Sequence, residues 1–113
     1  MHEASLVQSL LKQVGDLARD HRASRVTRVR VRIGELAGVE SELFRFAFDA
    51  LSPQTICDGA GLEILPEPVQ WNCEYCGIPI RAGEPLQCRM CGWPARLMQG
   101  SDLVLEQVEL ETV

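Results

Sequence analysis

Apolar side chains in the first twenty residues recur at the spacing of one face of an α-helix. They are Val7, Leu10, Leu11, Val14, Leu17 and Ala18. Polar residues fill the positions between them, so the pattern predicts an amphipathic helix over residues 3–20. His2 stands immediately before this helix and is a poor N-cap, because a cap is usually a short side chain with an oxygen acceptor.

A period of two replaces the helical spacing in the next stretch, VTRVRVRIG, which is typical of a half-buried strand. The alternating residues are Arg28, Val29, Arg30, Val31, Arg32 and Ile33. The arginine row could contact phosphates, but the acidic net charge of the chain favours a solvent-exposed sheet face instead. Gly34 and Gly38 bracket the turn that follows.

A second helix is expected to begin at Ser41, whose hydroxyl can cap it, and to end before Pro53. Its apolar face comprises Phe44, Ala47, Phe48 and Leu51.

Two further strands are predicted in the second half of the chain. The stretch LEILPEPVQW contains Pro66 and Pro68, which lack backbone donors, so this strand belongs at an edge or at the exit from a sheet. In the stretch DLVLEQVEL we assign the apolar face to Val104, Val108 and Leu110.

These elements predict an α+β fold in which two helices cover one face of a three-stranded sheet. A cysteine-rich segment, residues 71–98, interrupts the order as an inserted module, which we call the cysteine module. The α+β domain then comprises residues 1–70 and is completed by a strand within residues 99–113. Composition is ordinary for a globular protein, with 46% hydrophobic residues, and neither a low-complexity tract nor an internal repeat is evident.

The formal net charge of −5 argues against nucleic-acid binding, because phosphate contacts require surplus Lys and Arg. No stretch has the length and hydropathy of a membrane span, and charges scattered through the first twenty residues are unlike a signal peptide. We therefore expect a cytoplasmic protein with neither nucleic-acid nor membrane partners.

Four of the five cysteines form two C-x2-C-G pairs: Cys73, Cys76, Cys88 and Cys91. This spacing can place four thiolates around one Zn²⁺ ion, in a closed site that leaves no position for water and is therefore structural. Gly77 and Gly92 permit the positive φ that turns backbone N–H groups toward sulfur. Iron in a rubredoxin-like site uses the same spacing, so the residues leave zinc and iron open.

Other residues near this pattern are expected to be structural. Trp71 and Trp93 flank the cysteine module and are predicted to pack against its turns. Cys57 lies outside the pattern and is expected to be a small buried hydrophobe. His21, in the polar stretch after the first helix, is expected to be a solvated loop residue.

The opening Met-His-Glu offers a second metal site. The Met1 α-amine, the His2 amide nitrogen and the His2 imidazole can form two fused chelate rings, and the Glu3 amide or carboxylate can complete the set. Planar nitrogen ligands favour Ni(II) or Cu(II). A chance histidine at position 2 is the alternative, and the dipeptide alone favours this alternative, because so short a motif is weak evidence for a metal site.

Several segments together resemble the HypA/HybF family of hydrogenase nickel-incorporation proteins. They are MHEASL, IGELAGVESELFRFAF, GAGLEI, the double C-x2-C and DLVLEQVEL. The resemblance implies a nickel metallochaperone rather than an enzyme, with nickel bound at Met1, His2 and Glu3 and structural zinc bound by the four paired cysteines. It also implies an assisting role for Glu40. No histidine occurs in GWPARLMQGSD, so a nickel ligand from that stretch is not expected.

The resemblance implies two partners, a HypB-type GTPase and the large subunit of a [NiFe] hydrogenase. It leaves open whether urease draws on the same nickel and whether the chain forms a homodimer. The residues by themselves permit two other functions. One is a zinc-ribbon interaction module with an inert amino terminus, and the other is a rubredoxin-like electron carrier.

Overall fold

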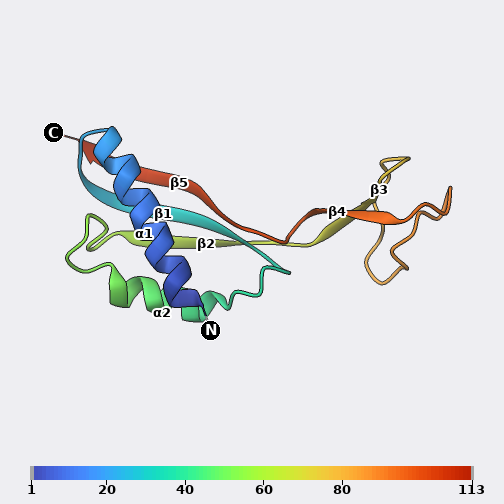
Figure 1. Ribbon diagram of the computed structural model, residues 1–113, viewed down its shortest axis with the longest axis horizontal. Helices are drawn as coiled ribbons and strands as arrows, with labels where there is room; N and C mark the ends of the chain where they lie inside the picture. The colour runs from blue at the N-terminus through green and yellow to red at the C-terminus, as the bar shows by residue number, and fades with distance from the viewer. Residues whose placement is uncertain (1, 113) are drawn as a thin grey trace.

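The structure, a computed structural model, describes residues 2–112. Its elements are α1 (Glu3–Asp20), β1 (Ala23–Gly34), α2 (Ser41–Leu51), β2 (Gly61–Glu67), β3 (Gln70–Cys73), β4 (Ala95–Gln99) and β5 (Leu103–Thr112). The molecule is elongated, 56 × 29 × 17 Å, with both helices toward one end and the β3–β4 pair toward the other (Figure 1). No helix within the described residues is long and apolar enough to cross a membrane.

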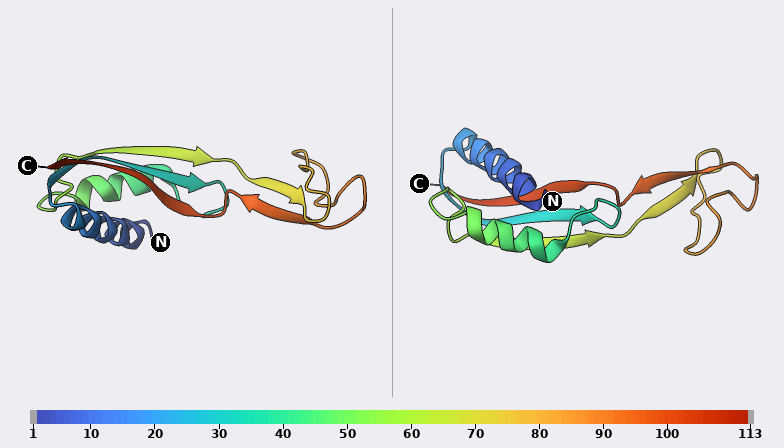
Figure 2. Two further views of the ribbon diagram at one scale, coloured as in Figure 1. Left: turned by 90° about the horizontal axis from the view of Figure 1, so that it is seen from above. Right: turned by 60° about the horizontal axis from the view of Figure 1, so that its bottom comes forward.

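One sheet has three strands in the order β2-β1-β5, with β1 parallel to β2 and antiparallel to β5. Both helices lie on the same face of this sheet (Figure 2, left). Helix α1 packs against β1 and β5, and α2 packs against β2. The predicted three-stranded sheet with two helices on one face is therefore confirmed. We call these five elements the α+β part.

The core of the α+β part is formed by the apolar positions that the two periodicities indicate. Side chains at most 1% exposed include Val7, Val14, Val29, Val31, Phe44 and Phe48. Burying each such side chain stabilises the fold by about 1.5–3 kcal/mol. Cys57 is fully buried in the same cluster, as predicted, and this burial raises the pKa of its thiol.

The opposite face of the sheet carries the arginine row, as predicted. Arg30 donates to Glu63 of β2 over 2.7 Å, and Arg32 pairs with Glu106 of β5. Acidic side chains from both neighbouring strands thus neutralise the row. Exposed ion pairs of this kind contribute little to stability, so this face is a solvated surface and not a phosphate-binding ribbon.

The prediction for the last strand is wrong in one respect. Arg30 pairs with Gln107 and Val31 with Leu105, so Glu106 is an extra residue in β5, which is a β-bulge. A bulge shifts the alternation of side chains by one position. Val104 is consequently 46% exposed, on the face opposite Val108 and Leu110.

The stretch predicted as one strand, LEILPEPVQW, is divided between two sheets. Strand β2 ends at Glu67 and forms an edge of the three-stranded sheet, whereas β3 begins at Gln70 and pairs with β4. The prolines lie at the edge and at the exit from the sheet, as predicted. Strand β4 was missed, because its short alternation, ARLMQ, becomes a strand only when β3 lies beside it.

Ser41 does not cap α2, contrary to the prediction. The N-cap position is Glu40, whose own side chain makes no capping bond. The Glu40 backbone N–H instead donates to the Glu3 carboxylate, 3.2 Å away. The start of α2 is thus tied to the start of α1, which no local sequence signal indicates.

Three chain segments meet where the α+β part joins the β3–β4 pair. A Cβ on Gly34 would lie 2.3 Å from the carbonyl carbon of Gly100, and one on Gly100 would lie 2.6 Å from Cα of Val69. Gly100 also has a φ of +100°. Hydrogen bonds reinforce this contact: Leu36 N–H donates to Gly100 O, and Val69 N–H donates to the Glu35 carboxylate. The junction is therefore a packed crossing.

Candidate metal centres

The four paired cysteines come together at the end of the molecule away from the helices. Their sulfur atoms all lie within 4.8 Å of one another, and the sulfurs of Cys73 and Cys91 are 3.6 Å apart. Four thiolates at the Zn–S distance of about 2.3 Å would be separated by roughly 3.8 Å in a tetrahedron. The cluster therefore fits a single tetrahedral metal ion such as zinc.

The two turns that hold the sulfurs repeat each other fifteen residues apart. Gly77 N–H donates to Cys73 O, and Gly92 N–H donates to Cys88 O, each over 2.9 Å. Both glycines have φ near +77°, as predicted. The segments NCEYCGIP and QCRMCGWP, each with one of the two C-x2-C-G pairs, are the sequence counterpart of these two turns.

Backbone N–H groups point at sulfur within each turn. Cys76 N–H donates to the Cys73 sulfur, and the N–H groups of Met90 and Cys91 donate to the Cys88 sulfur. The latter two bonds lower the pKa of Cys88 to about 7, whereas hydrogen bonding with Cys91 and burial raise that of Cys76 to about 12. Four thiols this close cannot all ionise unless a cation offsets their charge, which is what a bound dication supplies.

The tryptophans of the cysteine module behave differently from each other. Trp71 is partly buried in β3, whereas Trp93 is 52% exposed and lies against the Tyr75 ring, with centroids 6.0 Å apart. The expected packing of Trp93 against the turns is thus only partial. Within residues 71–98, only Cys73 and Cys88 are buried.

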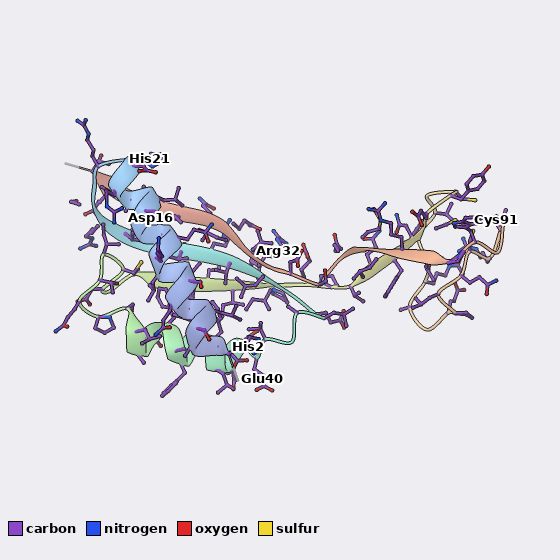
Figure 3. The ribbon with its side chains drawn as sticks, viewed as in Figure 1. His2, Asp16, His21, Arg32, Glu40 and Cys91 are labelled. Carbon is purple, nitrogen blue, oxygen red and sulfur yellow. The ribbon has the colours of Figure 1, made fainter. Side chains whose placement is uncertain are left out.

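The predicted nickel ligands lie in the α+β part, away from the cysteine cluster (Figure 3). His2 is exposed at the N-cap position of α1, and its side chain makes no capping bond, as expected. Met1 lies outside the described residues. Glu40 is exposed and is near His2 in Figure 3, at the start of α2.

Glu3 is held in place by its side chain. The residue is only 5% exposed, and its carboxylate accepts the hydrogen bond from Glu40 N–H. This bond lowers the pKa of the carboxyl group below its ordinary value. The backbone N–H of Glu3 is in the first turn of α1, where N–H groups have no backbone partner within the helix, and it also helps to lower the pKa of this carboxyl group.

His21 lies at the far end of α1 from His2 (Figure 3). It is exposed, as expected, and its Nδ1 is 2.9 Å from Leu17 O. The two histidines of the chain are therefore separated by the whole helix. Cys91 is at the opposite end of the molecule from His21, and His2 lies between them along the longest axis (Figure 3).

Comparison with known proteins identifies the family. A family model described as "Hydrogenase/urease nickel incorporation, metallochaperone, hypA" matches residues 1–110. This chain belongs to the HypA family. Family members are described as metallochaperones, so the chain is a metallochaperone of hydrogenase maturation and not an enzyme, as the resemblance implied.

Individual relatives cover nearly the whole chain. The hydrogenase maturation factor HypA of Nitrosospira multiformis is 42% identical over 99% of both chains, and that of Archaeoglobus fulgidus is 39% identical over 98% of this chain and 99% of its own. The solution structure of the nickel metallochaperone HypA from Helicobacter pylori has a TM-score of 0.75 at 27% identity, covering both chains fully. A second HypA solution structure has a TM-score of 0.81 at 29% identity, covering 97% of this chain and 96% of the other.

Proposed function

We propose that this HypA protein binds one Ni(II) ion at its amino terminus and passes it to a partner during [NiFe] hydrogenase maturation. The ligands are the Met1 α-amine, the His2 amide, the His2 imidazole and the Glu3 amide. The observation that supports this set is the position of the Glu3 carboxylate, which is buried and accepts the Glu40 N–H. With its carboxylate engaged, Glu3 offers its backbone nitrogen, and four nitrogens suit square-planar nickel.

The geometry suits transfer as well as binding. His2 is exposed, so an acceptor can displace the imidazole first and the remaining ligands afterwards. Coordination requires the α-amine in its deprotonated form, and its ordinary pKa is about 7.7–8.0. Nickel affinity should therefore rise steeply as pH increases through neutrality. Exposed Glu40, next to the tethered Glu3, is positioned to assist as an additional oxygen ligand.

We further propose that the four cysteines hold structural zinc and not cargo. Two of the four sulfur-bearing residues are buried, and a closed tetrahedral site has no open position for exchange. The division of the chain that we propose follows from this. Residues 1–70 and 99–113 carry the nickel site, and residues 71–98 form the inserted zinc-binding domain.

The proposed partners are a HypB-type GTPase, which works with this chain in nickel insertion, and the large subunit of a [NiFe] hydrogenase, which receives the metal in the cytoplasm. Family membership supports both. Exposed side chains on the cysteine module, among them Tyr75, Met90 and Trp93, provide apolar surface for docking beyond the nickel site.

The test is a nickel titration of the zinc-loaded protein by calorimetry. Four forms are compared: the native chain, His2→Ala, His21→Ala and a version with residues added before Met1. His2→Ala and the extended form should weaken binding by more than the roughly 10–100-fold that loss of a supporting residue costs. His21→Ala is the matched control and should bind nickel as the native chain does. Equal binding by all four forms would place the nickel site elsewhere.

A further inference from the structure

Strand β5 is a long edge of the three-stranded sheet. It runs for ten residues, and within residues 2–112 it pairs with β1 alone. Its outer side therefore presents backbone N–H and C=O groups to solvent, apart from the interruption at the Glu106 bulge. Such an edge can accept another extended strand.

A groove accompanies this edge on the helix-covered face. One cavity of about 350 Å³ begins at His2, and a second of about 450 Å³ ends at His21. Both are lined by Gln13 of α1 and Leu105 of β5, so they adjoin each other between the helix and the strand, and we call the two together the groove. Figure 1 shows α1 crossing the face of the sheet obliquely, with its C-terminal end near β5 and its N-terminal end near α2.

The floor of the groove is apolar. Leu103, Leu105, Val108 and Leu110 of β5 point to this face, pair in register with the core residues of β1, and stay only partly buried. An extended segment added to β5 would place every second side chain next to these residues, on the face of the sheet that the helices cover. The groove thus fits apolar side chains at alternate positions.

The charged residues on the face of the sheet away from the helices determine which side chains should separate the apolar residues of a bound segment. Strand β2 carries Glu63 and Glu67, β1 carries four arginines and no acid, and β5 carries Glu106, Glu109 and Glu111 with no cation. Acidic and basic rows therefore alternate from strand to strand. Opposite charges on neighbouring strands are favourable, and like charges directly opposite are unfavourable, so the next row beyond β5 should be basic.

The same charges disfavour a second copy of this chain as the occupant. Both edges of the three-stranded sheet, β2 and β5, carry only acidic charged residues. Pairing either edge with β5 of another copy would bring carboxylates together. The proline in β2 also removes a donor from that edge.

We propose that β5 and its groove bind an extended segment of a partner polypeptide in which apolar residues alternate with lysine or arginine. The groove opens at His2, so the bound segment brings the partner's own ligands to the nickel terminus. That last step rests on the proposed function, whereas binding of the segment itself does not.

The experiment uses a fluorescein-labelled decapeptide of alternating valine and lysine, capped at both ends, titrated into the zinc-loaded full chain without nickel. Two reference peptides alternate valine with glutamate, or carry the same valines and lysines in two blocks. The alternating lysine peptide should bind tightest. Amide NMR shifts should change along β5 and along the side of α1 that faces it.

Two variants with the same change in charge locate the site. Glu109→Lys lies on β5 and Glu42→Lys on the exposed side of α2, and neither glutamate is in an ion pair within the described residues. Glu109→Lys should weaken binding of the lysine peptide about fivefold and strengthen binding of the glutamate peptide, because one cross-strand charge pair contributes up to about 1 kcal/mol. Glu42→Lys should change neither. Gln13→Trp places a larger side chain in the groove and should weaken binding of both peptides.

Three results would overturn the proposal. They are shift changes that avoid β5, equal weakening by Glu109→Lys and Glu42→Lys, and a dimer in sedimentation equilibrium whose interface includes β5. Failure of the nickel titration leaves these measurements unaffected, so the two proposals fail separately.

Discussion

The α+β part and the cysteine module are held together by different interactions. The α+β part buries Val7, Val31 and Phe44 in one apolar cluster contributed by both helices and the sheet. Between residues 71 and 98, in contrast, only two cysteines are buried. Hydrophobic burial stabilises the first region, whereas the second has almost no core, so we expect its fold to depend on the metal ion that the cysteine cluster fits.

This difference between the two regions suits two different roles for a metal ion, one structural and one as delivered cargo. An ion on which a fold depends has to stay, and four sulfurs converging from two hydrogen-bonded turns form a closed site. An ion that is delivered has to leave, and an exposed histidine at the start of a helix provides replaceable ligands. Under the proposed function, one chain holds zinc and releases nickel, because the two candidate sites use separate residues in separate parts of the chain.

The largest expected effect is loss of the ion from the cysteine module. Cys73→Ala should remove zinc and unfold residues 71–98, since apparent zinc-binding energies of such sites are about 10–16 kcal/mol at pH 7. Amide NMR signals of the cysteine module should lose dispersion while those of α1 and β1 persist. Mass spectrometry should show one zinc ion in the Cys57→Ala control. Well-dispersed amide signals from a cysteine module without zinc would contradict the idea that this module depends on its metal ion for folding.

The second prediction concerns the α+β part and removes a large side chain from its core. Phe44 is fully buried, and Phe44→Ala should destabilise the α+β part by about 3–5 kcal/mol. Urea unfolding followed by circular dichroism of the helices measures this loss. Zinc content should not change. An equal loss of zinc affinity would show that the two regions fold as one unit.

The junction should respond with a smaller effect. Gly100→Ala places a Cβ against Val69 at a φ of +100° and should cost about 1–3 kcal/mol or shift the cysteine module relative to the sheet. Thermal melts and residual dipolar couplings distinguish these two results. Gly15→Ala is the control, because no atom lies within 4 Å of its added Cβ, and it should stabilise α1 slightly. Tolerance of both substitutions would mean that the junction is loose.

The smallest effect concerns Glu3. Its pKa is lower in the folded chain because Glu40 N–H donates to it, so it stabilises the fold above its unfolded pKa of about 4.3. That contribution disappears as pH falls through the lowered, folded pKa. As pH falls from 6 to 3, the melting temperature should decrease less steeply for Glu3→Gln than for the native chain. For Glu42→Gln, a change on the exposed surface of α2, the melting temperature should decrease as it does for the native chain.

Much of the fold could be predicted because each helix or strand carries its own period. The 3.6-residue spacing around Val7 and Phe44 and the alternation around Val29 require no partner to be recognised. The cysteine spacing likewise predicted the cluster, because two residues between thiols already define a turn.

The errors have a shared cause, which is that the deciding contact lies far away in the chain. The bulge at Glu106 exists because β5 is matched to β1, and it exposes Val104. Strand β4 depends on β3. The N-cap of α2 is satisfied by Glu3, thirty-seven positions earlier. None of these partners is adjacent in sequence, so no local pattern indicates them.

Residue type and spacing alone indicate the helices, the main strands, the arginine row, the paired cysteines and the candidate nickel tripeptide. Folding is needed to show that the Glu3 carboxylate is a tether, that two glycines pack the junction, and that two adjoining cavities lie between α1 and β5. A free strand edge, a close backbone approach and a long-range hydrogen bond arise only when distant segments are brought together, so no local pattern contains them.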